Sequence, residues 1–174
     1  MPRVYISIGS NQEREQNIVR ALDALKESFA ELILSSLYES EAVGFQGSHF
    51  YNMVVGFDTT QSLEEVFLLM RKIENENGRV RGGEKFSNRA LDLDILTYDD
   101  FVGDCGELKL PRYEITLNAF VLRPLAEIAV DYLHPLLGRS YKELWDMYDK
   151  AKQCLWIVDF EWHGNSISKA EIKS

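Results

Sequence analysis

The chain has 174 residues, of which 28 are acidic and 19 are basic, so its formal charge is −9. This length predicts one domain, and the 45% hydrophobic and 27% charged fractions are those of a folded globular protein rather than a disordered chain. The excess of acid argues against a protein that binds polymeric nucleic acid, because such binding depends on neutralising phosphates with Lys and Arg.

The cysteines and the apolar segments predict a cytoplasmic protein with no membrane contact. Cys105 and Cys154 lie far apart without C-x-x-C spacing, which favours free thiols in a reducing compartment over a zinc site or a disulfide. Met1 leads directly into a strand-like run, and no apolar stretch approaches the ~20 residues that span a bilayer. We expect a monomer, although an oligomer stays open.

In the first part of the chain, β-rich and helical patterns alternate. A strand is predicted over residues 4–8, after which Ser10 and Asn11 are candidate caps of a helix with apolar side chains at helical spacing. Strands are predicted over residues 32–38 and 51–57. Ser62 and Glu65 then form the sequence of a capping box at the start of a second helix, which Gly78 ends. A fourth strand is predicted over residues 91–98.

The last third of the sequence adds helical segments. Residues 120–128 predict a short or kinked helix because Pro124 interrupts the apolar spacing. Ser140 and Glu143 form a second capping-box sequence, residues 154–160 a further strand, and the polar residues from Gly164 a frayed tail. We expect a single domain over residues 1–163 and a polar tail over residues 164–174.

This order predicts an α+β fold of the ferredoxin-like type. The pattern βαββαβ is typical of an antiparallel sheet with helices on one side, here with additional C-terminal helices and a strand. Two connections, residues 39–50 and 78–90, are longer than such a fold requires. Long ordered loops are often functional, so we expect the chemistry there.

Basic side chains concentrate in residues 71–89. Six of the 19 basic residues fall in this window against three acids, a local charge of +3 in a protein of −9. A solvated helix end explains Arg71 and Lys72, but it does not explain the arginines of the following glycine-containing segment. Because a guanidinium presents a fork of donors to phosphate oxygens, the window is a candidate anion site.

Two carboxylates follow directly, at Asp92 and Asp94. Alternate residues of a strand share a face, so these two side chains point together while Leu91, Leu93 and Ile95 point into the core. Paired carboxylates can hold Mg²⁺, whose remaining ligands are waters and substrate phosphates; an acidic exposed strand face is the alternative. Metal-binding carboxylates beside phosphate-binding arginines are what phosphoryl transfer requires.

The motif resembles the centre of the 6-hydroxymethyl-7,8-dihydropterin pyrophosphokinase family. The resemblance rests on residues 78–81, the run 89–96 and several flanking blocks in the same order, and it covers roughly residues 4–145. The flanking blocks are residues 6–11, 36–40, 50–52, 111, 118–125 and 134–135.

The resemblance implies a ferredoxin-like enzyme that transfers an intact pyrophosphoryl group from ATP to the hydroxymethyl group of the pterin in folate biosynthesis, releasing AMP. Asp92 and Asp94 would hold two Mg²⁺ ions, and Arg79, Arg81 and Arg89 would hold phosphates, with the segment 79–89 closing over the site and excluding water.

The resemblance also implies positions for both substrates. Glu74 is a candidate support for the nucleotide site, with a solvated helix residue as the alternative. The implied nucleotide-side positions are Phe86, Ile95, Arg112 and Tyr113. The implied pterin-side positions are Ser40, Val43, Phe50, Asn52 and Phe120, of which the two phenylalanines would stack on the ring; taken singly, they could equally be core residues.

The chain departs from the family pattern at four positions. Arg112 stands where the family usually has histidine, Asn118 where it has a phosphate-binding arginine, Gly82 where a basic residue is common, and Phe86 where tryptophan is usual. We expect Arg112 to restore the charge lost at 118.

These departures keep a second function open, a non-catalytic or altered-specificity paralogue that binds pterin or nucleotide. A third, an RNA-binding module, would use aromatic side chains such as Tyr5 and Tyr51, but the acidic composition opposes it. The expected partners are therefore small molecules, ATP and a reduced pterin, and not nucleic acid or membranes.

Overall fold

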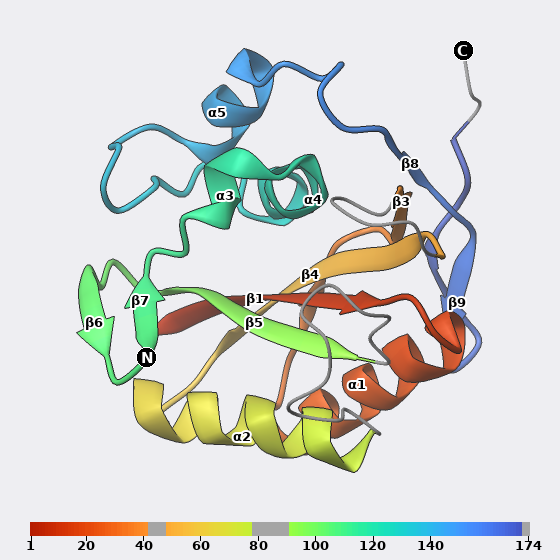
Figure 1. Cartoon of the computed structure of the whole chain (residues 1–174). Helices are drawn as coiled ribbons and strands as arrows, with labels where there is room; N and C mark the ends of the chain where they lie inside the picture. Colours follow the sequence, from red (N-terminus) through yellow and green to blue (C-terminus); the bar gives the residue numbers. More distant parts are fainter. Residues whose placement is uncertain (42–47, 78–90, 172–174) are drawn as a thin grey trace.

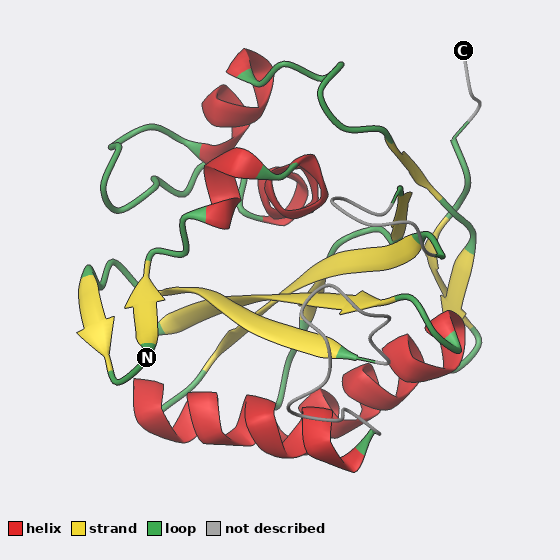
Figure 2. Cartoon of the chain, viewed as in Figure 1, coloured by secondary structure: helices red, strands yellow, loops and turns green. Residues whose placement is uncertain are grey.

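The structure is a computed structural model that describes residues 1–41, 48–77 and 91–171. A six-stranded antiparallel sheet lies at the centre, and helices pack against both of its faces (Figures 1 and 2). Its strands are β1 (Arg3–Ser10), β2 (Ile33–Leu34), β3 (Tyr38–Ser40), β4 (Phe50–Asp58), β5 (Asp92–Tyr98) and β8 (Leu155–Ile157). They are ordered β5-β1-β4-β3-β8, and β2 also pairs with β4. The predicted class of mixed helices and antiparallel strands is confirmed.

The helices divide between the two faces of the sheet. They are α1 (Arg14–Ser28), α2 (Leu63–Glu76), α3 (Glu114–Leu117), α4 (Ala119–Ile128) and α5 (Tyr141–Met147). The helices α1 and α2 lie against one face, and α4 with α5 lies over the other (Figure 1). Within the described residues, no helix combines the length and the apolar character that crossing a bilayer requires.

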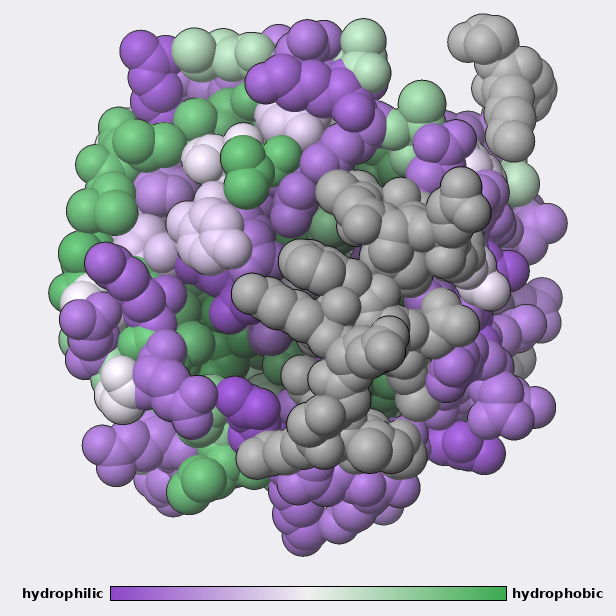
Figure 3. All heavy atoms as spheres, in the orientation of Figure 1, coloured by the Kyte–Doolittle hydropathy of each residue, from purple (hydrophilic) through white to green (hydrophobic). Residues whose placement is uncertain are grey.

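Alternation along the strands gives the sheet two different faces. In β1, Ile6 and Ile8 join the larger core beneath α1 and α2, whereas Tyr5 joins a smaller core with α4 and α5. The same alternation in β4 sends Met53 to the larger core and Val54 to the smaller one. Both faces of the sheet are therefore buried. In Figure 3, polar residues predominate over the right and lower parts of the described surface, and apolar residues gather at the upper left.

The predicted start is found for α2 but not for α1. Ser62 and Glu65 form the predicted capping box of α2, with Glu65 N donating to Ser62 Oγ at 3.2 Å and Ser62 N to Glu65 Oε1 at 3.0 Å. The prediction that Ser10 or Asn11 caps α1 is wrong. The N-cap is Glu13, in the left-handed region at φ 42°, and its side chain makes no capping hydrogen bond.

The strand predicted over residues 32–38 is divided into β2 and β3. Between them, Ser35 N donates to Val54 O at 3.0 Å, but Val54 N donates to the hydroxyl of Ser35 at 2.9 Å rather than to a backbone carbonyl. A side chain thus replaces the main chain in the ladder, which ends the regular pairing between the two short strands. Sequence periodicity does not reveal such a replacement.

The C-terminal segment is more ordered than its sequence predicts. The strand predicted over residues 154–160 is divided between β8 at the edge of the main sheet and β9 (Phe160–Trp162), which pairs with β10 (Asn165–Ser168). The expected frayed tail from Gly164 instead begins with β10. Beyond it, Arg123 of α4 donates to both carboxylate oxygens of Glu171, at 3.1 and 2.9 Å, and this guanidinium lowers the pKa of Glu171.

A hairpin beside β5 completes the fold. It consists of β6 (Gly103–Cys105) and β7 (Leu108–Leu110), and it leads through Pro111 into α3. The backbone N–H of Arg112 donates to Leu96 O at 3.0 Å, so this connection is tied to β5. The α4 helix is short, with Pro124 inside it, as the sequence predicts.

Candidate active site

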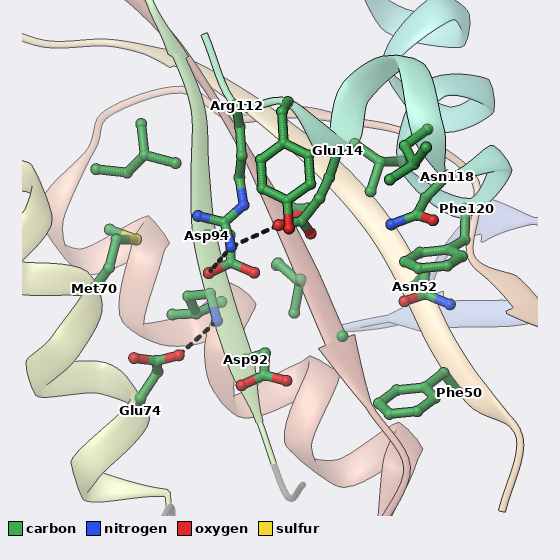
Figure 4. Close-up of a pocket in the computed structure, with 18 of the residues that line it drawn as sticks. Phe50, Asn52, Met70, Glu74, Asp92, Asp94, Arg112, Glu114, Asn118 and Phe120 are labelled. Carbon is green, nitrogen blue, oxygen red and sulfur yellow. Dashed lines mark hydrogen bonds and ion pairs between the residues drawn. The ribbon is translucent and has the colours of Figure 1, made fainter. Parts of the chain in front are cut away.

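A cavity of about 680 Å³ lies beside β5, the edge strand of the sheet, between α2 on one side and α3 with α4 on the other. Strands β1, β4 and β5 supply its floor, while α2, β7, α3 and α4 supply its walls (Figure 4). All ten described residues among the predicted site residues line it: Ser40, Phe50, Asn52, Glu74, Asp92, Asp94, Ile95, Arg112, Tyr113 and Phe120. The other five, Val43, Arg79, Arg81, Phe86 and Arg89, lie outside the described residues.

Asp92 and Asp94 project from β5 into this cavity (Figure 4). In the antiparallel ladder Asp92 lies opposite Gly9 and Asp94 opposite Ser7 of β1, while Leu93 points into the larger core. Alternation therefore directs both carboxylates to one face, as the sequence predicts.

Arg112 forms an ion pair with Asp94. Its Nη2 lies 3.6 Å from Asp94 Oδ1 and 2.9 Å from Glu114 Oε1. Its Nε is buried and, within the described part of the chain, has no hydrogen-bond partner. The guanidinium is thus shared between two acids and incompletely satisfied.

Phe50, Asn52 and Phe120 stand along one side of the cavity (Figure 4). The amide of Asn52 is fixed, because its Nδ2 donates to Ser40 Oγ at 2.7 Å. Gly9 on the neighbouring strand makes room for it, since a Cβ there would lie 3.2 Å from Asn52 Oδ1. Two rings beside an amide edge suit a flat heterocycle with hydrogen-bonding groups.

The α2 helix forms the opposite side, with Met70 and Glu74 facing the cavity in Figure 4. Glu74 is 1% exposed, and its Oε2 accepts a hydrogen bond from Leu93 N at 2.9 Å. This burial contradicts the alternative of a solvated helix residue. Next to it, the guanidinium of Arg71 lies 4.9 Å from the ring centre of Phe67.

An exposed carboxylate, that of Glu127, ties α4, and hence Phe120, to the sheet. Glu127 of α4 accepts hydrogen bonds from Ser36 N at 2.9 Å, from Ser36 Oγ at 2.7 Å and from Tyr38 OH at 2.8 Å. Burial, together with the neighbouring Glu127 carboxylate, raises the pKa of Tyr38, so its hydroxyl remains a donor.

Asn118 also lines the cavity, at the start of α4. Its Oδ1 accepts from Gln153 Nε2 at 3.0 Å, and Gln153 Oε1 accepts from Ala119 N at 2.9 Å. Asn118 therefore belongs to a hydrogen-bonded helix start and lies on the same cavity as Arg112.

The sequence reasoning missed several lining residues, including Ser7, Gly9, Phe67 and Glu114. Ser7 and Gly9 had a usable signal, because they alternate with the core residues of β1 just as the aspartates do in β5. Glu114 lies two residues after Arg112, but nothing in the sequence indicates that the two side chains meet.

The carboxylate set of the cavity fits Mg²⁺. No group of three or more His, Cys, Asp or Glu side chains arranged to hold a metal occurs in the described ranges. Mg²⁺ does not require one, since it commonly binds through one or two carboxylates and completes its shell with waters and substrate phosphates. Asp92 and Asp94 supply those two carboxylates.

Comparison with known proteins relates the chain as a whole to one family. The sequence profile described as 7,8-dihydro-6-hydroxymethylpterin-pyrophosphokinase (HPPK) matches residues 5–130. A 2-amino-4-hydroxy-6-hydroxymethyldihydropteridine pyrophosphokinase of Pseudomonas aeruginosa is 39% identical over 147 residues, which are 82% of this chain and 89% of that protein. The protein of that name from Aquifex aeolicus is 34% identical over 145 residues, 82% of this chain and 90% of its own.

Solved structures show the same fold at low identity. A crystal structure of a Plasmodium falciparum HPPK-DHPS triple mutant with pteroate has a TM-score of 0.67 at 13% identity, covering 90% of this chain. This chain spans 47% of that protein's length, so the likeness concerns about half of it.

Proposed function

The chain belongs to the 7,8-dihydro-6-hydroxymethylpterin-pyrophosphokinase family, and from this membership we propose how its cavity carries out the reaction. The protein is a pyrophosphokinase of folate biosynthesis, with ATP as co-substrate. In the proposed reaction the hydroxymethyl oxygen of the pterin attacks the β-phosphorus of ATP. The bond from that phosphorus to the bridging oxygen of the α-phosphate breaks, AMP leaves, and the hydroxyl proton is released.

The two sides of the cavity support a division between the substrates. We assign the pterin to Phe50, Asn52 and Phe120, together with Ser40, because the two rings and the fixed amide suit a flat heterocycle. Val43, outside the described residues, is proposed for the same substrate. Asp92 and Asp94 lie between this side and α2 (Figure 4), which is where a group passing from one substrate to the other would have to lie.

The nucleotide is assigned to the opposite side, near Glu74, Ile95, Arg112 and Tyr113. Phe86, Arg79, Arg81 and Arg89 are proposed to contact the nucleotide or its phosphates, and they lie outside the described residues. Bound Mg²⁺, proposed as two ions on Asp92 and Asp94, would neutralise phosphate oxygens and orient the triphosphate. Positioning and charge neutralisation are then the main contributions of the protein.

A binding paralogue without turnover is the competing function, and Asn118 in place of arginine motivates it. Losing one charge-assisted hydrogen bond of about 1.5–3 kcal/mol in the transition state slows a reaction by about 10- to 100-fold. Arg112 lines the same cavity and carries the charge that position 118 lacks. We therefore retain catalysis as the proposed function.

Formation of AMP is the test. The protein is incubated with ATP, Mg²⁺ and 6-hydroxymethyl-7,8-dihydropterin, beside Asp92→Asn and the matched control Asp131→Asn, which alters an exposed carboxylate outside the cavity. Wild type and Asp131→Asn should form AMP at similar rates, and Asp92→Asn at least about 100-fold more slowly. Substrate binding without AMP above the Asp92→Asn level would favour the paralogue.

Two finer structural assignments accompany the function. We propose that the fold is ferredoxin-like, supported by the chain order β1-α1-β3-β4-α2-β5 and the antiparallel order β5-β1-β4-β3. We also propose one domain that includes residues 164–171, since β10 pairs with β9 and Glu171 is bound by Arg123.

A further inference from the structure

Arg112 is held more closely by Glu114 than by Asp94. Its Nη2 forms an ion pair with Glu114 Oε1 at 2.9 Å, whereas the distance to Asp94 Oδ1 is 3.6 Å, which exceeds hydrogen-bond distance. The three side chains are 22–37% exposed, so solvent screens their charges only in part. Figure 4 shows the guanidinium reaching down toward Asp94 while Glu114 approaches it from α3.

The backbone at Arg112 is fixed, so a shift of its guanidinium from Glu114 to Asp94 would be a movement of the side chain alone. Arg112 N donates to Leu96 O at 3.0 Å, and Arg112 O accepts from Ile115 N at 3.2 Å. The buried Nε has no partner in the described part of the chain, although such a group costs free energy when unpaired. The arrangement is therefore a compromise between two carboxylates rather than a fully satisfied ion pair.

We infer that Glu114 is a positioning residue that holds Arg112 and thereby keeps Asp94 available to a divalent cation. This inference rests on the proposed function, in which Asp94 is a metal ligand. A guanidinium and a metal ion compete for the same carboxylate oxygens. Arg112 has two ion-pair partners in the described part of the chain, Glu114 and Asp94. If the Glu114 carboxylate is removed, Asp94 is the partner that remains. The metal would then have to displace a full ion pair.

A positioning role for Glu114 and a direct role as a metal ligand predict different effects of mutation. If Glu114 acts through Arg112, removing its charge weakens metal binding only while Arg112 is present. If Glu114 instead binds the metal or adds to its field, the loss is the same with or without Arg112. A double-mutant cycle separates these possibilities.

The experiment is a titration with Mn²⁺ alone, in which free Mn²⁺ is measured by its electron paramagnetic resonance signal. We expect Glu114→Gln to weaken Mn²⁺ binding by about three- to tenfold, within the range of couplings between neighbouring side chains. Arg112→Gln should bind Mn²⁺ at least as tightly as wild type. The double variant Glu114→Gln/Arg112→Gln should have an Mn²⁺ affinity within about twofold of that of Arg112→Gln. Asp94→Asn identifies the site, since it should abolish this binding.

Glu107→Gln is the matched control, because Glu107 also lines the cavity but pairs with Arg71 at 4.0 Å rather than with Arg112. It should leave Mn²⁺ affinity unchanged within about twofold. Equal losses from Glu114→Gln in both backgrounds, or no loss in either, would overturn the inference. If Glu114→Gln fails to fold, Glu114→Asp, whose carboxylate reaches less far, replaces it in the cycle.

Different results would contradict the role of Glu114 and the proposed function. Absence of AMP formation by the wild-type protein counts against the proposed function, whatever the metal titrations give. Normal AMP formation with a flat mutant cycle counts against the role of Glu114 alone.

Discussion

Glu74 Oε2 accepts a hydrogen bond from the backbone N–H of Leu93 at 2.9 Å, which joins α2 to β5 between the two aspartates of the cavity. Leu93 is the residue between Asp92 and Asp94, so the carboxylate of Glu74 fixes the part of the strand from which both project. Because Glu74 is 1% exposed, water cannot replace it as an acceptor without a structural change.

Substitution of Glu74 is therefore predicted to destabilise the protein. Glu74→Ala leaves the buried N–H of Leu93 without this acceptor and should lower the free energy of unfolding by about 1–3 kcal/mol. Glu74→Gln should cost less, since its amide oxygen can accept the same bond. Urea denaturation measures both, with Glu76→Ala on the exposed side of the same helix as the control, expected within about 0.5 kcal/mol of wild type. Equal stability of Glu74→Ala and Glu76→Ala would contradict the prediction.

The aromatic side of the cavity gives a prediction about pterin affinity. Phe50→Leu and Phe120→Leu should each raise the KM for the pterin by about 2- to 10-fold and change the KM for ATP little, since stacking contributes about 0.5–1.5 kcal/mol. Steady-state kinetics with each substrate varied in turn provides the measurement. Phe101→Leu, at an exposed position outside the cavity, is the control. A larger effect on ATP than on pterin would reverse the assignment of the two sides.

His134 gives a prediction about pH. Its Nδ1 accepts hydrogen bonds from Leu136 N and Leu137 N, both at 3.2 Å, so this nitrogen carries no proton. Burial lowers the pKa of His134 below its usual value of 6.5. The folded state thus binds this proton less readily than the unfolded state, and the stability that depends on neutral His134 is present above pH 6.5 and declines as the pH falls below it.

Denaturation between pH 7.5 and 5.5 tests this prediction. Wild type should lose about 1 kcal/mol over this interval relative to His134→Asn, since protonation removes two hydrogen bonds to the backbone. His163→Asn, at an exposed histidine paired with Asp23 on another part of the surface, is the control and should retain the dependence due to His134. Parallel pH profiles for wild type and His134→Asn would disprove the assignment.

Gln153 is predicted to stabilise the start of α4. Gln153→Ala removes the acceptor of Ala119 N and the donor to Asn118 Oδ1, and should lower the free energy of unfolding by about 1–2 kcal/mol. Because Phe120 follows directly, the KM for the pterin should also rise. Gln153→Glu retains the acceptor and should lose less stability. The exposed neighbour gives the control Lys152→Ala, and matching losses in Gln153→Ala and Lys152→Ala would exclude the proposed role.

The sequence predicts the features that depend on local pattern. The alternation in β5 correctly directs Asp92 and Asp94 to one face, and the capping box of α2 is where Ser62 and Glu65 indicate it. Both features follow from the spacing of a few neighbouring residues, so no knowledge of the rest of the chain is needed.

The features that the sequence does not predict depend on distant partners. The break between β2 and β3 depends on the hydroxyl of Ser35 taking a place in the ladder of β4. The order of the C-terminal segment depends on Arg123, 48 residues away from Glu171. The pairing of Arg112 with both Asp94 and Glu114 depends on the direction in which the chain passes from the β6–β7 hairpin into α3, and no local sequence pattern encodes that direction. Tertiary contacts decide each of these cases.

The cavity has a consequence for the protein during its synthesis. Its floor comes from residues 7–9, from Phe50 and Asn52, and from residues 92–95. The later-made lining residues are Arg112, Tyr113, Asn118 and Phe120, and Gln153, which holds the start of α4, is made later still. Proteins are made from the N-terminus at about 5–20 residues per second, so a ribosome-bound chain carries both aspartates for about 1–5 seconds before Phe120 is added. Such a chain would have the proposed metal ligands without Arg112, Tyr113 and Phe120 of the cavity. We therefore expect the incomplete chain not to hydrolyse ATP before α3 and α4 have folded.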